Sequence, residues 1–262
     1  MSNQAKERPI LFSAPMVRAI LEGRKTVTRR EVKVQPRSSA DIGSFGRGQP
    51  FIRHPDVTKA NPECPYGRPG DRLWVRETWG VISHDFDEHG NMIDWKPDRP
   101  ASKIREMRFG RGYYSGHVIY RADGEAAWAG DDDGGGDDRS AWKPSIHMPR
   151  IACRILLEIT DVRVERLQDI SEDQAKAEGV RLYTDHAELG EWWHVDGIET
   201  YSADPRKSFE LLWTSVGGDW NANPWVWVVE FKRVTLPHNE NQLSPVSHRH
   251  AVLEPAQVLL VH

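Results

Sequence analysis

The residues best suited to chemistry are grouped between Gly23 and Arg30, where the sequence reads Gly-Arg-Lys-Thr-Val-Thr-Arg-Arg. This stretch places an amine, two hydroxyls and several guanidinium groups at an expected helix-to-strand turn. A lysine beside arginines loses its proton more readily when it is partly desolvated, and the free amine can then act as a base. An arginine nearby can bind a phosphate or stabilise an oxyanion. The cluster therefore predicts either a catalytic site or a solvated basic turn.

Lys25 and Thr28 are the residues to which we assign the base and the nucleophile. A hydroxyl within reach of an unprotonated amine becomes an activated nucleophile. Thr26, Arg29 and Arg30 are the expected substrate contacts around them. Alternation along a strand would place Thr26 and Thr28 on the same face as Arg30. The competing interpretation, a solvated basic turn, is typical of turns rich in Lys and Arg.

Three further candidates lie far from this cluster in the chain. Glu178 falls in the last turn of a helix expected after the capping box Ser171–Gln174, where the helix dipole opposes a carboxylate. It is either an exposed surface acid or an acid/base partner for the lysine. Glu77 is either a buried, paired acid or a residue that faces a pocket. Trp79 is either a core residue or, beside a nucleobase pocket, one of its walls.

Charge, cysteine content and hydropathy restrict the class of protein. The 262 residues carry a net charge of −4, yet positions 1–37 hold nine Lys and Arg against three Glu, which favours a local phosphate-binding face. Cys64 and Cys153 form neither a disulfide framework nor a CxxC metal site, and no histidine pattern is typical of a metal site. No signal peptide and no apolar run near the ~20 residues of a transmembrane helix are evident. We therefore expect a cytoplasmic protein with no membrane partner, metal ion or cofactor.

Short strands alternate with a few short helices in the predicted order of elements. Periodicity, N-caps and glycine stops give strands 10–12, 26–34, 73–79, 117–121, 151–167 and 225–231, and helices 15–21, 172–178 and 205–216. The last strand is apolar on both faces, as expected at the centre of a barrel. This order predicts an α+β fold, a small β-barrel with short flanking helices and long loop insertions, and not a doubly wound sheet.

Three segments are expected to be insertions into a single discontinuous domain that spans residues 9–235. They cover about 35–63, 83–112 and 122–141, and a tail follows at 236–262. The run Asp131–Asp138 is interpreted as a flexible acidic loop and not as a calcium loop, because it lacks a spaced ligand pattern. Residues 258–261 would either add an edge strand or be disordered.

Five separated blocks of the sequence resemble the ASCH domain. They are Gly23-x-Lys25-x-x-Thr28-x-Arg30, Pro69–Glu77, Leu167–Ser171, Ala175-x-x-Glu178-Gly179 and Trp225–Phe231. This resemblance implies a PUA-like β-barrel that handles RNA or modified nucleosides. Residues 15–21 and 142–149 also look like ASCH proteins of phages and prophages, which implies the cytoplasm of a bacterial or phage-infected host cell.

The threonine at position 28 is similar to that of the small bacterial N4-acetylcytidine amidohydrolases, whereas the common ASCH pattern has Glu there. The catalytic Lys, Thr and Glu of those enzymes correspond to Lys25, Thr28 and Glu178. The resemblance implies metal-free hydrolysis of an amide on a modified pyrimidine base, N4-acetylcytosine-like, in a nucleoside or in a single-stranded or flipped-out nucleic-acid site. This chain is more than twice the length of those enzymes, and its insertions leave the acyl group and the substrate open.

Two alternatives remain beside hydrolysis. One is a non-catalytic module that binds RNA, DNA or a modified base in the same cavity. The other is a nuclease, since some ASCH proteins look like RNases. A pure binding module needs shape and stacking surfaces, and it has no use for a nucleophile next to a base. The pairing of Lys25 with Thr28 therefore favours an enzyme over a pure binding module, and shortening of a polymer on a gel would indicate the nuclease.

Overall fold

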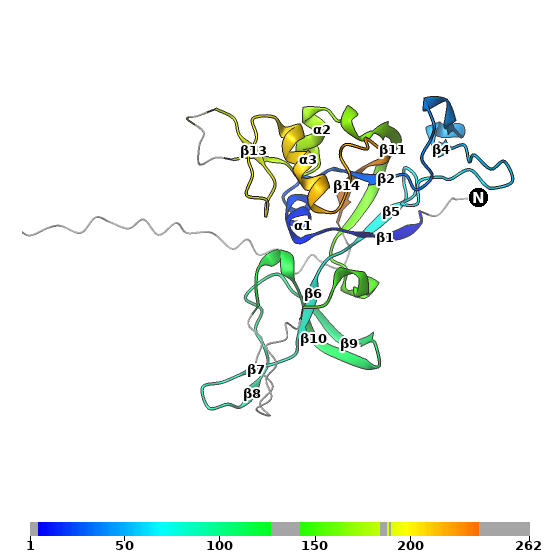
Figure 1. The fold of residues 1–262 in the computed structure, drawn as a ribbon. Helices are drawn as coiled ribbons and strands as arrows, with labels where there is room; N and C mark the ends of the chain where they lie inside the picture. The colour runs from blue at the N-terminus through cyan, green and yellow to red at the C-terminus, as the bar shows by residue number, and fades with distance from the viewer. Residues whose placement is uncertain (1–4, 127–141, 184–187, 189, 236–262) are drawn as a thin grey trace, which may run out of the picture.

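The computed structural model describes residues 5–126, 142–183, 188 and 190–235, which form an α+β fold with two lobes (Figure 1). The larger lobe is built on a five-stranded sheet in the order β1-β5-β11-β14-β2. Its strands are β1 (Glu7–Leu11), β5 (Arg72–Arg76), β11 (Leu156–Arg166), β14 (Trp225–Val234) and β2 (Val27–Glu31). Only β1 and β5 pair in parallel; the other neighbours are antiparallel.

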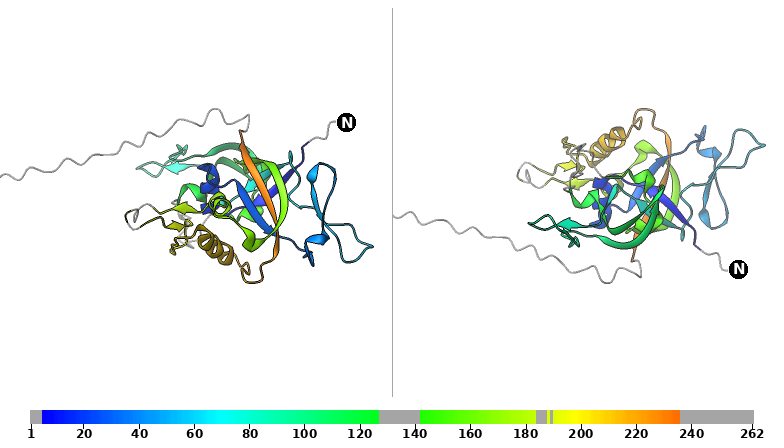
Figure 2. Two further views of the ribbon diagram at one scale, coloured as in Figure 1. Left: turned by 90° about the horizontal axis from the view of Figure 1, so that it is seen from above. Right: turned by 90° about the horizontal axis from the view of Figure 1, so that it is seen from below.

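This sheet is strongly curved but does not close into a barrel (Figure 2). Its two edge strands, β1 and β2, are not paired with each other in the described residues. The α+β class predicted from the sequence is therefore confirmed. The closed barrel is not present as a ring of hydrogen-bonded strands within the described part of the chain.

Within the described residues, three α-helices accompany the larger sheet: α1 (Ala14–Leu21), α2 (Glu172–Ala177) and α3 (Pro205–Ser215). α1 begins after Ser13, with Pro15 in its first turn, and buries one face. It ends before Gly23, whose φ of +76° is readily adopted only by glycine. α2 carries the predicted capping box and packs against α3. Because α1 ends before Gly23, the basic residues that follow Gly23 begin in the turn between α1 and β2.

The smaller lobe contains a second sheet, in the order β6-β10-β9. Its strands are β6 (Trp79–Ile82), β10 (Gly112–Tyr120) and β9 (Ser102–Phe109). The prediction of one strand over 73–79 was wrong, because the chain leaves the first sheet after Arg76 and joins the second at Trp79. The expected insertion 83–112 is not wholly irregular, since it contains β9 and a short hairpin, β7 (Asp85–Phe86) and β8 (Met92–Ile93).

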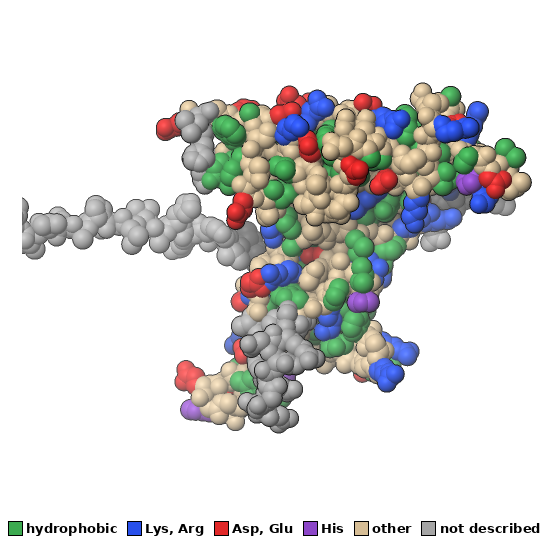
Figure 3. Space-filling model, viewed as in Figure 1, with side chains coloured by type: hydrophobic (Ala, Val, Ile, Leu, Met, Phe, Trp, Pro, Cys, Tyr) green, Lys and Arg blue, Asp and Glu red, His purple; other side chains and the backbone are tan. Residues whose placement is uncertain are grey.

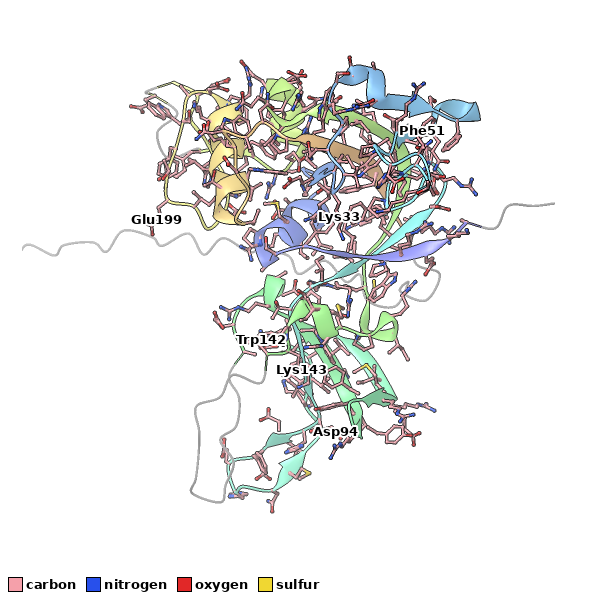
Figure 4. The ribbon with its side chains drawn as sticks, turned by 45° about the vertical axis from the view of Figure 1, so that its right-hand side comes forward. Lys33, Phe51, Asp94, Trp142, Lys143 and Glu199 are labelled. Atoms are coloured by element: carbon pink, nitrogen blue, oxygen red, sulfur yellow. The ribbon has the colours of Figure 1, made fainter. Side chains whose placement is uncertain are left out.

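Each lobe has its own hydrophobic core. In the larger lobe, four consecutive residues of β14, Val226–Val229, are buried on both faces of the sheet, as predicted for a central strand. In the smaller lobe, Trp79, Met107 and Tyr120 form a separate cluster. Lys143 lies on this cluster, with its ammonium 4.9 Å from the centroid of the Tyr114 ring (Figure 4).

The remaining described segments are short hairpins at the periphery. Residues 35–63 form β3 (Ile42–Ser44) and β4 (Pro50–Ile52) with 3-10 turns, and β12 (Arg181–Leu182) pairs with β13 (Trp193–His194). The predicted acidic loop Asp131–Asp138 and the tail 236–262 lie outside the described residues. Among the helices that the structure describes, none combines the length and apolar character needed to cross a bilayer.

Candidate active site

A cavity of about 620 Å³ opens beside the start of β2. It brings together the beginning of α1, strand β2, the end of α2 and the end of α3. Its polar lining consists of Ser13, Lys25, Thr28, Arg29, Arg30, Glu31, Thr78, Ser145 and Glu178. Its apolar lining includes Phe12, Met16, Phe209, Leu212 and Trp213. A cavity of this volume and mixed lining is of the size that accepts a small-molecule ligand.

Backbone hydrogen bonds fix Lys25 at the floor of this cavity. Its amide donates to Ala19 O of α1 at 3.0 Å, and the amide of Thr26 donates to Ala177 O of α2 at 2.9 Å. The Lys25 side chain is almost fully excluded from solvent. Its Nζ donates to Glu178 Oε2 at 2.6 Å, to Glu178 O at 2.9 Å and to Val27 O at 2.8 Å. The three protons of the ammonium thus have three oxygen acceptors.

Glu178 is the C-cap residue of α2, and it is buried. Its carboxylate accepts a second hydrogen bond, from Arg29 Nη1 at 3.2 Å. The helix dipole disfavours a carboxylate at this end, and the two cations offset that cost. The Lys25 ammonium also binds the terminal carbonyl of the helix, as cations commonly do at a helix C-terminus.

Arg29 joins this pair to the rest of the larger lobe. Its other terminal nitrogen donates to Glu165 at 3.2 Å and to Gln174 at 2.9 Å. The Gln174 side chain also closes the capping box of α2, by accepting from the Ser171 amide at 2.9 Å. Arg29 was expected to contact substrate; the structure shows it lining the cavity while its guanidinium holds Glu178 in place.

Burial lowers the pKa of Lys25 below its ordinary value of 10.5. The Glu178 carboxylate opposes this effect by attraction and by its hydrogen bond, whereas the charges of Arg30 and Arg29 lower the pKa further. Loss of the proton from this amine therefore costs less free energy here than in water. A lowered lysine pKa inside a cavity is one of the features found at catalytic sites.

Thr28 and Arg30 face the same cavity from β2. The Thr28 side chain is buried, and its hydroxyl has no hydrogen-bond partner within the described residues. Arg30 donates to Leu11 O at 2.8 Å, and its Nε is buried without a partner in the described part of the chain. The Phe12 ring lies beneath both cations, 5.6 Å from Lys25 Nζ and 5.4 Å from Arg30 Cζ.

Three predicted substrate contacts do not line the cavity. Thr26 is exposed, because β2 begins only at Val27 and the alternation does not extend back to it. Trp79 is fully buried in the smaller lobe, edge-on to Phe109 at 5.1 Å. Its position is that of a core residue and not of a wall of this cavity.

Glu77 is also outside the cavity, in a buried ion pair. Both of its carboxylate oxygens accept hydrogen bonds from Arg154, each at 2.9 Å. Arg154 also binds Asp123 at 2.6 Å, and its guanidinium lies 3.9 Å from the centroid of the Tyr120 ring. Glu77 and Arg154 lie on the two segments that link the sheets, so this pair ties the lobes together at the crossing.

The sequence reasoning missed the apolar wall of the cavity. Phe209, Leu212 and Trp213 recur at helical spacing in α3, a pattern that an ordinary core-facing helix also has. It also missed Thr78 and Ser145, which come from the segments that join the lobes. No local pattern distinguishes them from other turn hydroxyls.

The arrangement can perform acid–base and nucleophilic chemistry with its own side chains: an amine, a carboxylate, a hydroxyl and a guanidinium share one cavity. In the part of the chain that the structure covers, no three His, Cys, Asp or Glu side chains are grouped to hold a metal ion. Comparisons with protein-family models, curated proteins and solved structures found no match to this chain.

Proposed function

We propose that the protein hydrolyses an amide on a modified pyrimidine base, N4-acetylcytosine-like, in a nucleoside or a nucleic acid, on a PUA-like scaffold. The observation that carries this proposal is the 2.6 Å contact between Lys25 Nζ and the Glu178 carboxylate, in a cavity that Thr28 also lines. Acyl transfer needs a base, an acid and a nucleophile, and these three side chains are of the required types.

The number of protons that the Lys25 and Glu178 side chains hold together suits this reaction. The ion pair holds the same number of protons as a neutral amine beside a neutral carboxylic acid. Transfer of one proton across the 2.6 Å contact therefore creates the base and the acid together. Because burial lowers the pKa of Lys25, the lysine gives up its proton more readily than it would in water.

In the proposed reaction the Thr28 hydroxyl oxygen attacks the acyl carbon and passes its proton to Lys25. Arg30 stabilises the resulting oxyanion. Glu178 then gives its proton to the exocyclic nitrogen, the C–N bond breaks, and the base leaves with a free amine. An ester on Thr28 remains; water attacks it with Lys25 as base and Glu178 as acid, which releases the carboxylic acid and regenerates Thr28.

The apolar wall supports a flat aromatic substrate. Phe12 and Trp213 line the cavity, and the face of a nucleobase stacks on such rings with about 1–3 kcal/mol per base. The hydroxyls of Ser13, Thr78 and Ser145 provide hydrogen-bonding groups on the remaining walls. A pyrimidine nucleoside presents both an apolar face and polar edges, so it matches this mixed lining.

The test is release of cytidine from N4-acetylcytidine, followed by mass spectrometry. We expect activity in the wild type and its loss in Lys25→Ala, Thr28→Val and Glu178→Gln. Thr26→Val is the matched control, because it makes the same change two residues away on an exposed side chain. An inert wild type, or a Thr28→Val variant as active as Thr26→Val, would refute the proposal.

A second candidate is a module that binds the modified base without turnover. It is favoured by the three hydrogen bonds that satisfy the Lys25 ammonium inside the protein. Calorimetric titration of N4-acetylcytidine separates the two functions. Tight binding with no cytidine released by the wild type indicates the binding module, and shortening of an RNA strand on a gel would instead indicate a nuclease.

A further inference from the structure

The β9–β10 hairpin of the smaller lobe carries a group of exposed cations. Lys103, Arg105, Arg108 and Arg111 are all exposed, and none of them forms an ion pair within the described residues. Lys and Arg side chains are gathered at the end of this hairpin in the space-filling view (Figure 3). Glu106 is the single acidic residue of the hairpin, in a chain whose net charge is −4.

The strand register places Lys103 and Arg108 on one face of the hairpin, because the register shift between Tyr114 and Gly116 puts one extra residue into β9 between them. Arg108 pairs with Tyr113, and Lys103 pairs with His117. Residues directly opposite each other in an antiparallel pair lie on the same side of the sheet. Tyr113 is 70% exposed, so a large aromatic ring is accessible to solvent beside Arg108.

The opposite face of the hairpin is buried and stabilises the fold, whereas the exposed cations do not contribute to that stability. Ile104 and Met107 point into the core of the smaller lobe and are buried there. That burial holds the hairpin, whereas neighbouring like charges on its outer face repel each other and weaken it. Unpaired cations beside an exposed aromatic ring are typical of surfaces that bind the backbone and bases of single-stranded nucleic acid.

The hairpin is connected to the rim of the cavity by one sheet. Strand β10 pairs with β6, and Tyr120 lies opposite Trp79 at the start of β6. The residue before Trp79 is Thr78, which lines the cavity. A strand rises about 3.4 Å per residue, and β9 is bulged between these two residues, so Lys103 and Arg108 are separated by less than about 17 Å along it, a length that still spans several phosphates of a nucleic acid.

We infer that the outer face of the β9–β10 hairpin binds the phosphodiester backbone of a single-stranded nucleic acid, whose modified base enters the cavity. The second half of this inference rests on the proposed function, and it makes a polymer the preferred substrate, of which the free nucleoside is the minimal reacting part. The cations bind phosphates, and Tyr113 stacks on a base. The polymer could be RNA or DNA, since both present the same phosphodiester groups.

The experiment measures binding of short fluorescent single-stranded RNA and DNA of one unmodified sequence by anisotropy, from about 50 to 200 mM salt. We expect affinity that falls with salt, and a slope of log K against log salt that becomes less negative by about 0.7 for each phosphate contact removed. Arg105→Ala/Arg108→Ala should weaken binding and reduce the slope by about 1.4. Tyr113→Ala should weaken binding with little change in the slope.

Lys6→Ala/Arg53→Ala is the matched control, because it removes two exposed cations from the larger lobe that, like those of the hairpin, form no ion pair within the described residues. Equal loss of affinity in both double variants, or no binding of either oligonucleotide, would overturn the inference. Binding of anionic lipid vesicles in place of the oligonucleotides would also overturn it.

Because the oligonucleotides carry no modified base, their binding does not depend on hydrolysis. The hairpin variants should hydrolyse free N4-acetylcytidine at the wild-type rate. Hairpin-dependent binding without any cytidine release would refute the proposed function and leave the binding surface intact. Cytidine release without hairpin-dependent binding would refute the binding surface and leave the proposed function intact.

Discussion

Lys25 and Glu178 lie 153 positions apart in the chain and meet with Nζ 2.6 Å from Oε2. The side chains of both are almost entirely excluded from solvent. The partnership is asymmetric, because Glu178 has a second cation, Arg29, whereas Lys25 has no other carboxylate among its hydrogen-bond partners in the described residues. The two members of the pair therefore contribute differently to stability.

Replacement of Glu178 should destabilise the protein more than replacement of Lys25. Glu178→Gln leaves two buried cations without their shared carboxylate, and breaking a buried pair costs about 3–5 kcal/mol. Lys25→Met leaves Glu178 with Arg29 at 3.2 Å, so its cost should be smaller. Urea unfolding of both variants gives the two free energies. Equal losses, or a larger loss for Lys25→Met, would contradict the asymmetry.

Glu22→Gln is the matched control for this comparison. Glu22 pairs with Arg24 at 2.6 Å, but its side chain is 49% exposed. Exposed ion pairs contribute at most about 1 kcal/mol, so the same substitution should have little effect there.

The pH dependence of hydrolysis should follow the proton that Lys25 and Glu178 share. The reactive pair holds one proton more than the fully deprotonated pair, so kcat/KM should fall as the pH rises through the pKa of Lys25. Burial and the arginines place that pKa below 10.5. Arg30→Gln removes one of the charges that lower it, so the alkaline limb should move to higher pH. A pH–rate profile in which kcat/KM instead rises through this range would show that the neutral amine beside a carboxylate is the active form.

The same proton links stability to pH with a definite sign. Between the lowered pKa of Lys25 in the native state and 10.5, the unfolded chain holds the proton and the native chain has released it. Because the unfolded state then binds more protons, this group makes the free energy of unfolding rise with pH in that window. Denaturant unfolding at several pH values, compared with Lys25→Met, isolates this contribution.

The local signals in the sequence predicted the elements that carry the site. The glycine stop at Gly23, the capping box at Ser171 and the doubly apolar strand 225–231 all rest on contacts within a few residues, and the structure confirms each of them. These elements bring Lys25, Thr28 and Glu178 to one cavity. Whether that cavity performs the proposed hydrolysis stays a prediction.

The features that the sequence did not reveal depend on long-range pairing. Strand 73–79 has one continuous pattern, yet its two halves pair with different partners, β11 and β10. That division moves Trp79 into the second core. Likewise, the role of Arg29 depends on Glu165, which comes beside it only through the register of β2, β14 and β11. A short stretch of the sequence does not specify which strands pair or in what register.

Glu77 should prove necessary for stability and dispensable for the reaction. Glu77→Gln leaves the buried Arg154 with Asp123 alone, so we expect a loss of about 3 kcal/mol in urea unfolding. The kcat/KM of the folded fraction should be unchanged, because Glu77 does not line the cavity. The double variant Glu77→Met/Arg154→Met should recover part of the lost stability. Wild-type stability with abolished activity would instead restore the role of Glu77 as a substrate contact.

Gly218 should control how well the cavity accepts its substrate. A Cβ at this position would lie 2.2 Å from Trp213 Nε1 and 2.6 Å from Cδ1, so Gly218→Ala forces the buried indole to move. Since Trp213 lines the cavity, we expect KM to rise several-fold with a smaller change in kcat, and stability to fall by about 1–3 kcal/mol from overpacking. Gly46→Ala is the control, because a Cβ there meets nothing within 4 Å. If both variants keep the wild-type KM, the Trp213 ring is not part of the substrate-binding wall.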